Sequence, residues 1–221
     1  SHFLKMLSYL LANQEVQGVR TVERFRKKFE DDPATFMLID NVTKGHTDTI
    51  LFNIDIEGSI DKDQTAVLRV FAKMFYKYLG FYGENLKVVR LEQLVKNRGK
   101  TDEFRQVFEE KHGISWLESR DAFEFLEDDV VETLKEVLGM SETSAHNWFN
   151  RDVNVDFSIA QLVSEMKEYV RQQSDDFRLL FMVDEVGQYV GGDTSLLINL
   201  QSLVEEIGSK CKGKIWVVCT G

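Results

Sequence analysis

The sequence predicts an α/β fold in which a parallel sheet is flanked by helices and interrupted by a largely helical segment. Three short apolar runs, at 49–55, 179–184 and 214–219, have the length and composition of strands buried on both faces. The longer stretches between them carry apolar residues at helical spacing. A strand, a helix over 194–210 and a further strand with a short return make a parallel crossover unit, which is the core of the predicted sheet.

Residues 1–83 are predicted to form the N-terminal part of the sheet domain. The spacing of apolar residues predicts helices over 3–12, 16–29 and 63–79, with the strand 49–55 between the second and third of these. A further helix over 33–43 is predicted from Asp32-Pro33, because Asp is a good N-cap and proline suits the first helical position. This part therefore contributes helices, one strand and a further helix.

Residues 84–157 are predicted to be a helical insertion, and residues 158–221 the second part of the sheet domain. The insertion shows helical patterns near 85–96, 101–112, 119–138 and 141–149, without a convincing strand. Between Asp121 and Glu136 there are seven acids and one lysine, which predicts a negative, solvated surface. Solubility is the simple interpretation of this surface, and a partner-binding face is the alternative. A helix over 158–172 leads into the strand 179–184.

Composition excludes several classes of function. A net charge of −10 argues against a broad phosphate-binding surface, because non-specific nucleic-acid affinity comes from clustered Lys and Arg. Cys211 and Cys219 have no metal-binding spacing, so neither a disulfide framework nor a zinc site is expected, and a reducing cytoplasm is the expected setting. No apolar stretch approaches the ~20 residues of a membrane-spanning helix, so no membrane association is expected.

Two adjacent carboxylates, Asp184 and Glu185, follow the most apolar strand. In open parallel sheets, ligands bind outside the carboxyl ends of the strands. A buried strand that ends in two acids is typical of the Walker B segment of nucleoside triphosphatases. In that arrangement the first acid, Asp184, binds the Mg²⁺ side of the nucleotide, and the second, Glu185, polarises the attacking water. The alternative is an ordinary buried strand that ends in a solvated acidic loop.

Two further residues are candidates for the same site. Thr220 follows the strand 214–219, where P-loop ATPases with an additional strand carry a polar sensor, although a threonine there can simply cap the next turn. No G-x-x-x-x-G-K-[ST] phosphate loop occurs in the sequence. A helix nevertheless begins at once with Ser1-His2-Phe3, as helices that follow a phosphate loop do. We therefore interpret Ser1 as the nucleotide- and Mg²⁺-binding serine of such a loop, and a tag remnant is the alternative.

Three segments, 1–11, 49–55 and 177–192, resemble the large P-loop ATPases of bacterial BREX phage-defence systems (the BrxC/PglY type). The most specific part is the string VDEVGQY at 183–189. The resemblance implies a large cytoplasmic AAA+-like ATPase of the additional-strand class, an oligomer that uses ATP and Mg²⁺ and acts on DNA with other BREX components, among them a methyltransferase. Carried over by position, Asp184 is the metal-side acid, Glu185 the catalytic base, Thr220 the sensor and Ser1 the remnant of the phosphate loop. The phosphate-loop lysine of the family is not present, so these 221 residues alone are expected to bind ATP very weakly and to be inactive.

Two other functions compete with this one. The first is a non-catalytic scaffold with a degenerate ATPase fold that binds partners through its acidic helical middle. Glu185 argues against it, because a scaffold has no need for the second acid. The second is a metal-dependent nuclease that uses Asp55, Asp184 and Glu185. A separate expectation is that the outer edge of the strand 214–219 is unpaired, so that the chain self-associates there.

Overall fold

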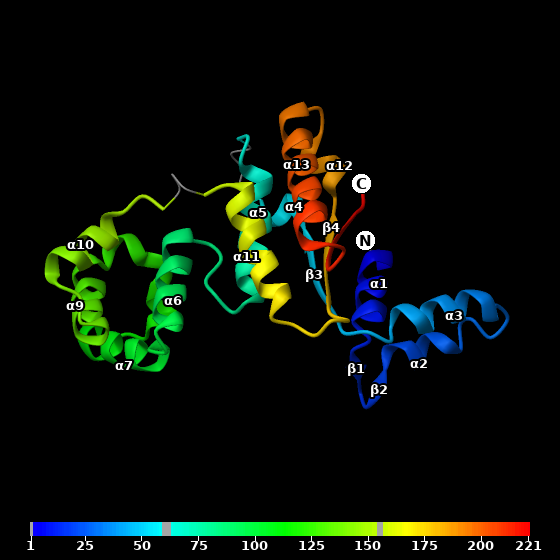
Figure 1. Ribbon diagram of the computed structural model, residues 1–221, viewed down its shortest axis with the longest axis horizontal. Helices are drawn as coiled ribbons and strands as arrows, with labels where there is room; N and C mark the ends of the chain where they lie inside the picture. Colours follow the sequence, from blue (N-terminus) through cyan, green and yellow to red (C-terminus); the bar gives the residue numbers. More distant parts are fainter. Residues whose placement is uncertain (1, 59–62, 154–156) are drawn as a thin grey trace. The chain divides into compact units, whose positions relative to one another are not determined.

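A computed structural model describes residues 2–58, 63–153 and 157–221 (Figure 1). The chain divides into two compact units, which we call unit 1 (Ser1–Phe71 with Ser158–Gly221) and unit 2 (Ala72–Phe157). The sequence placed the boundaries of the insertion at 83/84 and 157/158. In the structure the first division lies at 71/72, within helix α5 (Ala66–Tyr78), and the second lies at 157/158.

Unit 1 contains a three-stranded parallel sheet, so the predicted α/β class and parallel sheet are confirmed. Its strands are β3 (Thr47–Asn53), β4 (Arg178–Asp184) and β5 (Ile215–Cys219), and β4 lies in the middle. The register places Asn53 opposite Asp184 and Val183 opposite Cys219. Helix α13 (Thr194–Cys211) connects β4 to β5, as the crossover pattern predicted. The carboxyl ends of the three strands therefore meet at one edge of the sheet.

Both faces of the central strand β4 are covered, which explains its uninterrupted apolar sequence. On one face, the ring of Phe181 lies 5.3 Å from that of Phe71 on α5, measured between centroids. On the other face, Leu180 and Met182 pack against Leu4 of helix α1 (His2–Ala12). Helix α11 (Ile159–Arg171) packs against α13 and completes the unit.

The prediction of one helix over 16–29 is wrong. The structure has an antiparallel hairpin of β1 (Glu15–Val16) and β2 (Val19–Arg20), followed by the short helix α2 (Thr21–Arg26). The two turn residues, Gln17 and Gly18, have φ angles of 53° and 77°. Two consecutive left-handed residues form the turn that matches the twist of a two-residue hairpin, and glycine favours it. Helix α3 (Pro33–Val42) begins as predicted, with the Asp32 carboxylate accepting a hydrogen bond from the Thr35 amide at 3.1 Å.

Short helices follow β3 and β4 at the carboxyl edge of the sheet. Strand β3 ends at Asn53 and not at Asp55, because the Asn53 side chain caps helix α4 (Ile54–Glu57). Helix α12 (Val186–Val190) follows β4 and packs against α4. The contact is close, since a Cβ atom on Gly58 would lie 2.6 Å from Cε2 of Tyr189. Glycine is therefore required at position 58 for the two short helices to meet.

The described residues of unit 2 form helices and no strand. The elements are α6 (Leu86–Asn97), α7 (Thr101–His112), α8 (Trp116–Ser119), η1 (Arg120–Phe125), α9 (Glu127–Leu138) and α10 (Glu142–Asn150). The predicted helix 119–138 is thus divided among three elements. The core of unit 2 combines aliphatic and aromatic side chains, and the Trp116 ring lies edge-on to Phe104 and Phe108 at 5.2 and 5.1 Å.

Most acids of the run between Asp121 and Glu136 contact a basic or histidine side chain within unit 2. Glu136 pairs with Lys111 at 2.8 Å, and Asp129 contacts the His112 ring at 2.6 Å. Five of the seven acids have a basic or histidine partner in this way: Glu124, Glu127, Asp129, Glu132 and Glu136. Acids of this run therefore connect α9 to neighbouring helices. The sequence predicted a solvated surface and did not predict these contacts.

Strand β5 pairs on one side only, with β4, among the residues that the structure describes. Its Trp216 side chain is 57% exposed. An open strand edge with an exposed aromatic residue is what the expectation of self-association requires, and self-association itself stays a prediction. Within the same described ranges, no helix combines the length and the apolar character that crossing a membrane demands.

Candidate functional site

Asp184 lies at the centre of the carboxyl edge of the sheet. It is the last residue of the central strand β4 and is only 8% exposed. The hydroxyl of Thr220, which directly follows β5, donates a hydrogen bond of 2.5 Å to Asp184 Oδ1. The structure thus brings together two of the residues that the sequence singled out, although they lie 36 positions apart.

Backbone hydrogen bonds hold this pair in place. The Thr220 amide donates to the Val183 carbonyl at 3.0 Å, and the Val186 amide donates to the Thr220 carbonyl at 2.9 Å. The residue after β5 is therefore bonded on both sides of the turn that follows β4. Gly187, in α12, lies beside Gly221, and a Cβ atom on Gly187 would be 3.4 Å from the Gly221 Cα.

Glu185 has a left-handed backbone, with φ 63° and ψ 31°. It is the N-cap of α12, and its carbonyl accepts a hydrogen bond from the Tyr189 amide at 3.0 Å. Its carboxylate makes no hydrogen bond or ion pair with any residue in the described ranges. For a residue with a Cβ atom this conformation costs about 1–2 kcal/mol. Such backbone strain concentrates at functional sites, so the conformation of Glu185 marks this edge of the sheet as a candidate site.

Replacing Glu185 by glycine should stabilise unit 1. Glycine removes the steric cost of the left-handed backbone but loses more entropy on folding, so we expect a net gain of about 0.5–1 kcal/mol. Urea unfolding monitored by circular dichroism would measure it. Glu185→Ala is the matched control, because it removes the carboxylate and keeps the Cβ atom. Equal stability of the glycine and alanine variants would show that the backbone of residue 185 is not strained.

The remaining predicted site residues lie elsewhere or cannot be placed. Asp55 lies on α4, beyond the end of β3. No group of three or more His, Cys, Asp or Glu side chains is placed to hold a metal ion in the ranges that the structure describes. Asp55, Asp184 and Glu185 therefore do not form the metal cluster that the nuclease hypothesis needs. Ser1 lies outside the described residues.

A single carboxylate nevertheless fits Mg²⁺ bound together with a nucleotide. Mg²⁺ is usually held by one or two carboxylates, with phosphate oxygens and waters completing its octahedron. Asp184 supplies one buried carboxylate whose orientation is fixed by Thr220. The donor set thus suits a metal that arrives with phosphates better than a metal held by protein ligands alone.

Sequence reasoning missed Asn53 at this edge. It lies opposite Asp184 in the β3–β4 register, and its side-chain oxygen accepts hydrogen bonds from the amides of Asp55 and Ile56. The residue type itself could have indicated this role, because asparagine is a strong N-cap and is depleted inside strands. Asn53 therefore ends β3 and starts the turn that faces α12.

Comparison of the chain with known proteins found no match among protein-family models and none among solved structures.

Proposed function

We propose that unit 1 is the Walker B and sensor part of an ATP-hydrolysing P-loop domain, from a large ATPase of the BREX type. The observation that carries the proposal is the Thr220 hydrogen bond to Asp184, made between the ends of adjacent parallel strands, with Glu185 next in the chain. The parallel sheet and its helices agree with the proposal without distinguishing it from other α/β domains. The resemblance of 183–189 to BREX ATPases supplies the particular family.

Each residue takes a distinct role in this proposal. Asp184 holds the Mg²⁺ side of ATP, where the metal neutralises the charge of the phosphate oxygens. Glu185 orients and polarises the attacking water. A threonine hydroxyl can donate one hydrogen bond, and Thr220 donates it to Asp184. Its oxygen can then only accept, so its remaining partner is the attacking water and not a phosphate oxygen.

The proposal assigns phosphate binding to residues that precede His2. The loop that holds the β- and γ-phosphates would lie before this residue, with Ser1 as its last member. The strand that leads into such a loop would pair with the open edge of β5. In the whole protein, the proposal extends to an oligomer that acts with other BREX components on DNA.

The scaffold alternative receives less support from unit 2 than from the sequence. That hypothesis used the acidic run between Asp121 and Glu136 as a docking surface. Three of its seven acids pair with lysines and two contact histidines within unit 2, which leaves fewer free carboxylates for a partner. The left-handed backbone of Glu185 is also a cost that a scaffold would not need to retain.

The test is MgATP binding and turnover by a chain extended upstream through the preceding strand and loop, beside the 221-residue chain. We expect the extended chain to hydrolyse ATP and the shorter chain to bind it very weakly. Glu185→Gln in the extended chain should lower turnover by about 10²–10⁴-fold and leave ATP bound, because it removes the general base. Asp184→Asn should abolish the Mg²⁺ dependence of binding.

The matched control is Glu205→Gln, an exposed glutamate in the second half of α13, which should leave turnover unchanged. An extended chain that neither binds nor hydrolyses ATP would contradict the proposal. In that case the acids at the sheet edge would have no catalytic role, and the scaffold hypothesis would replace the ATPase proposal.

A further inference from the structure

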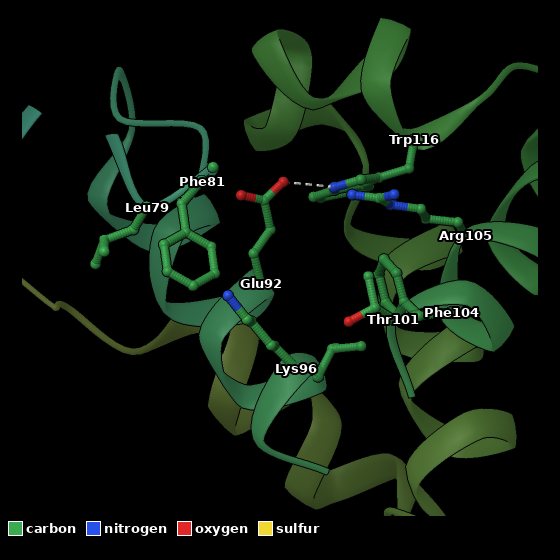
Figure 2. Close-up of a pocket in the computed structure, with 10 residues that line it drawn as sticks. Leu79, Phe81, Glu92, Lys96, Thr101, Phe104, Arg105 and Trp116 are labelled. Carbon is green, nitrogen blue, oxygen red and sulfur yellow. Dashed lines mark hydrogen bonds between the residues drawn. The ribbon is translucent and has the colours of Figure 1, made fainter. Parts of the chain in front are cut away.

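We propose that unit 2 contains a binding pocket for a small aromatic carboxylate. A cavity of about 190 Å³ lies among residues 79–81, α6, α7 and Trp116 of α8, all of which belong to unit 2 (Figure 2). An apolar cavity of ~150 Å³ is enough to bind benzene. The cavity in unit 2 therefore has room for one six-membered ring and a small substituent.

The walls of the pocket are aromatic. Phe81, Phe104 and Trp116 line it, together with the aliphatic side chains of Leu79 and Val95. The indole of Trp116 is fixed, because its Nε1 donates to Glu92 Oε1 at 2.9 Å, as the dashed line in Figure 2 shows. Flat, fixed aromatic faces favour a flat apolar ligand, which can stack or pack edge-on against them.

The acid in the pocket, Glu92, is already satisfied. Its Oε1 also accepts from Arg120 Nη1 at 2.8 Å, and its Oε2 accepts from the Tyr82 amide at 2.7 Å. The side chain is only 11% exposed. Because the negative charge of Glu92 is paired with Arg120, it neither attracts a cationic ligand nor strongly repels an anionic one.

Two other cations leave the pocket with a positive charge. Lys96 of α6 and Arg105 of α7 both line it. Neither forms an ion pair or a hydrogen bond within the described residues, and the Lys96 ammonium lies 4.8 Å from the centre of the Phe81 ring. The Thr101 hydroxyl lies at the same cavity. An arginine with unused donors matches a carboxylate, which it can bind with two parallel hydrogen bonds.

The size, walls and charge of the pocket together specify the ligand class. The cavity accepts one ring, the aromatic and aliphatic walls favour an apolar ring, and the positive charges of Arg105 and Lys96 favour an anionic head. This inference concerns unit 2 alone and does not depend on the proposed ATPase function of unit 1.

The experiment is a titration of the ¹⁵N-labelled 221-residue chain with benzoate and phenylacetate, followed by NMR. We expect saturable shifts of the Trp116 indole N–H and the Thr101 amide. The indole N–H of Trp216, which belongs to unit 1, should not move. Benzamide tests the charge, and we expect it to bind about tenfold more weakly than benzoate, because its neutral amide has one acceptor oxygen and cannot form a two-bond ion pair with Arg105. Acetate and inorganic phosphate test the ring, and both should bind about tenfold more weakly than benzoate.

Variants test whether Lys96 and Arg105 determine the affinity for benzoate. Lys96→Gln combined with Arg105→Gln should weaken benzoate binding by at least about tenfold and weaken benzamide binding much less, because benzamide carries no charge. Arg98→Gln is the matched control, since Arg98 is exposed, is the C-cap of α6 two residues after Lys96 and does not line the cavity. Equal affinity for benzoate and benzamide would overturn the proposal. So would phosphate binding as tight as that of benzoate, or no saturation below about 20 mM ligand.

Discussion

Phe181→Ala is expected to lower the free energy of unfolding of unit 1 by about 4 kcal/mol. Phe181 is fully buried in the middle of β4, the strand that pairs on both sides. Its ring contacts Phe71 of α5, which in turn lies edge-on to Phe52 of β3 at 5.6 Å. Truncation removes the transfer free energy of the ring and leaves a cavity that neighbouring strands and helices cannot fill.

Hydrogen exchange followed by mass spectrometry would locate the effect. We expect amides of β3, β4 and β5 to exchange faster in the variant, while those of α7 and α9 stay unchanged. Phe3→Ala is the matched control, because Phe3 belongs to the same unit and is 66% exposed, and it should change stability by less than about 0.5 kcal/mol. A loss below about 1 kcal/mol for Phe181→Ala would show that the centre of the sheet is not packed as the structure has it.

Glu92→Ala should destabilise unit 2 by about 3 kcal/mol. The substitution leaves the Trp116 indole N–H, the Arg120 guanidinium and the Tyr82 amide without their acceptor. The Arg120 side chain is 21% exposed, so its charge cannot be fully hydrated once the partner is gone. We place the expected value at the lower end of the range for broken buried ion pairs, because Arg120 retains some contact with solvent.

Urea unfolding, followed by the near-ultraviolet circular dichroism of tryptophan, would measure this loss of unfolding free energy. Glu92→Gln should fall between the wild type and the alanine variant, since the amide keeps one acceptor oxygen and loses the charge. The control is Glu109→Ala on the exposed side of α7, with an expected change below about 0.5 kcal/mol. If Glu92→Ala destabilised no more than Glu109→Ala, the Glu92 network would not hold unit 2 together.

Sequence patterns predicted most of the elements because their signals were local and strong. Residues 179–184 read as a strand buried on both faces, and β4 is covered by α5 on one face and α1 on the other. The meeting of Asp184 and Thr220 could also be anticipated, since carboxyl ends of neighbouring parallel strands share one edge. What could not be anticipated was that the two side chains would bond directly, because that contact joins residues 36 positions apart and depends on how each side chain is oriented.

The predictions that were wrong or missing also have physical causes. Apolar spacing over 16–29 suited a helix, but the left-handed pair Gln17-Gly18 made a hairpin more favourable. Strand β3 was predicted to reach Asp55, whereas Asn53 ended it by capping α4. No motif indicated the pocket of unit 2, because its cations and aromatic walls come from separate helices and meet only through tertiary packing.

The backbone hydrogen bonds of Thr220 have a consequence for affinity. Ordering a side chain at a binding interface costs about 0.5–1.5 kcal/mol when that side chain is free to rotate beforehand. Thr220 is bonded through its amide and carbonyl to both sides of the turn after β4, and its hydroxyl is bonded to Asp184. Both side chains are thus ordered before any ligand arrives, and a ligand that binds Asp184 loses none of its binding free energy to immobilising them.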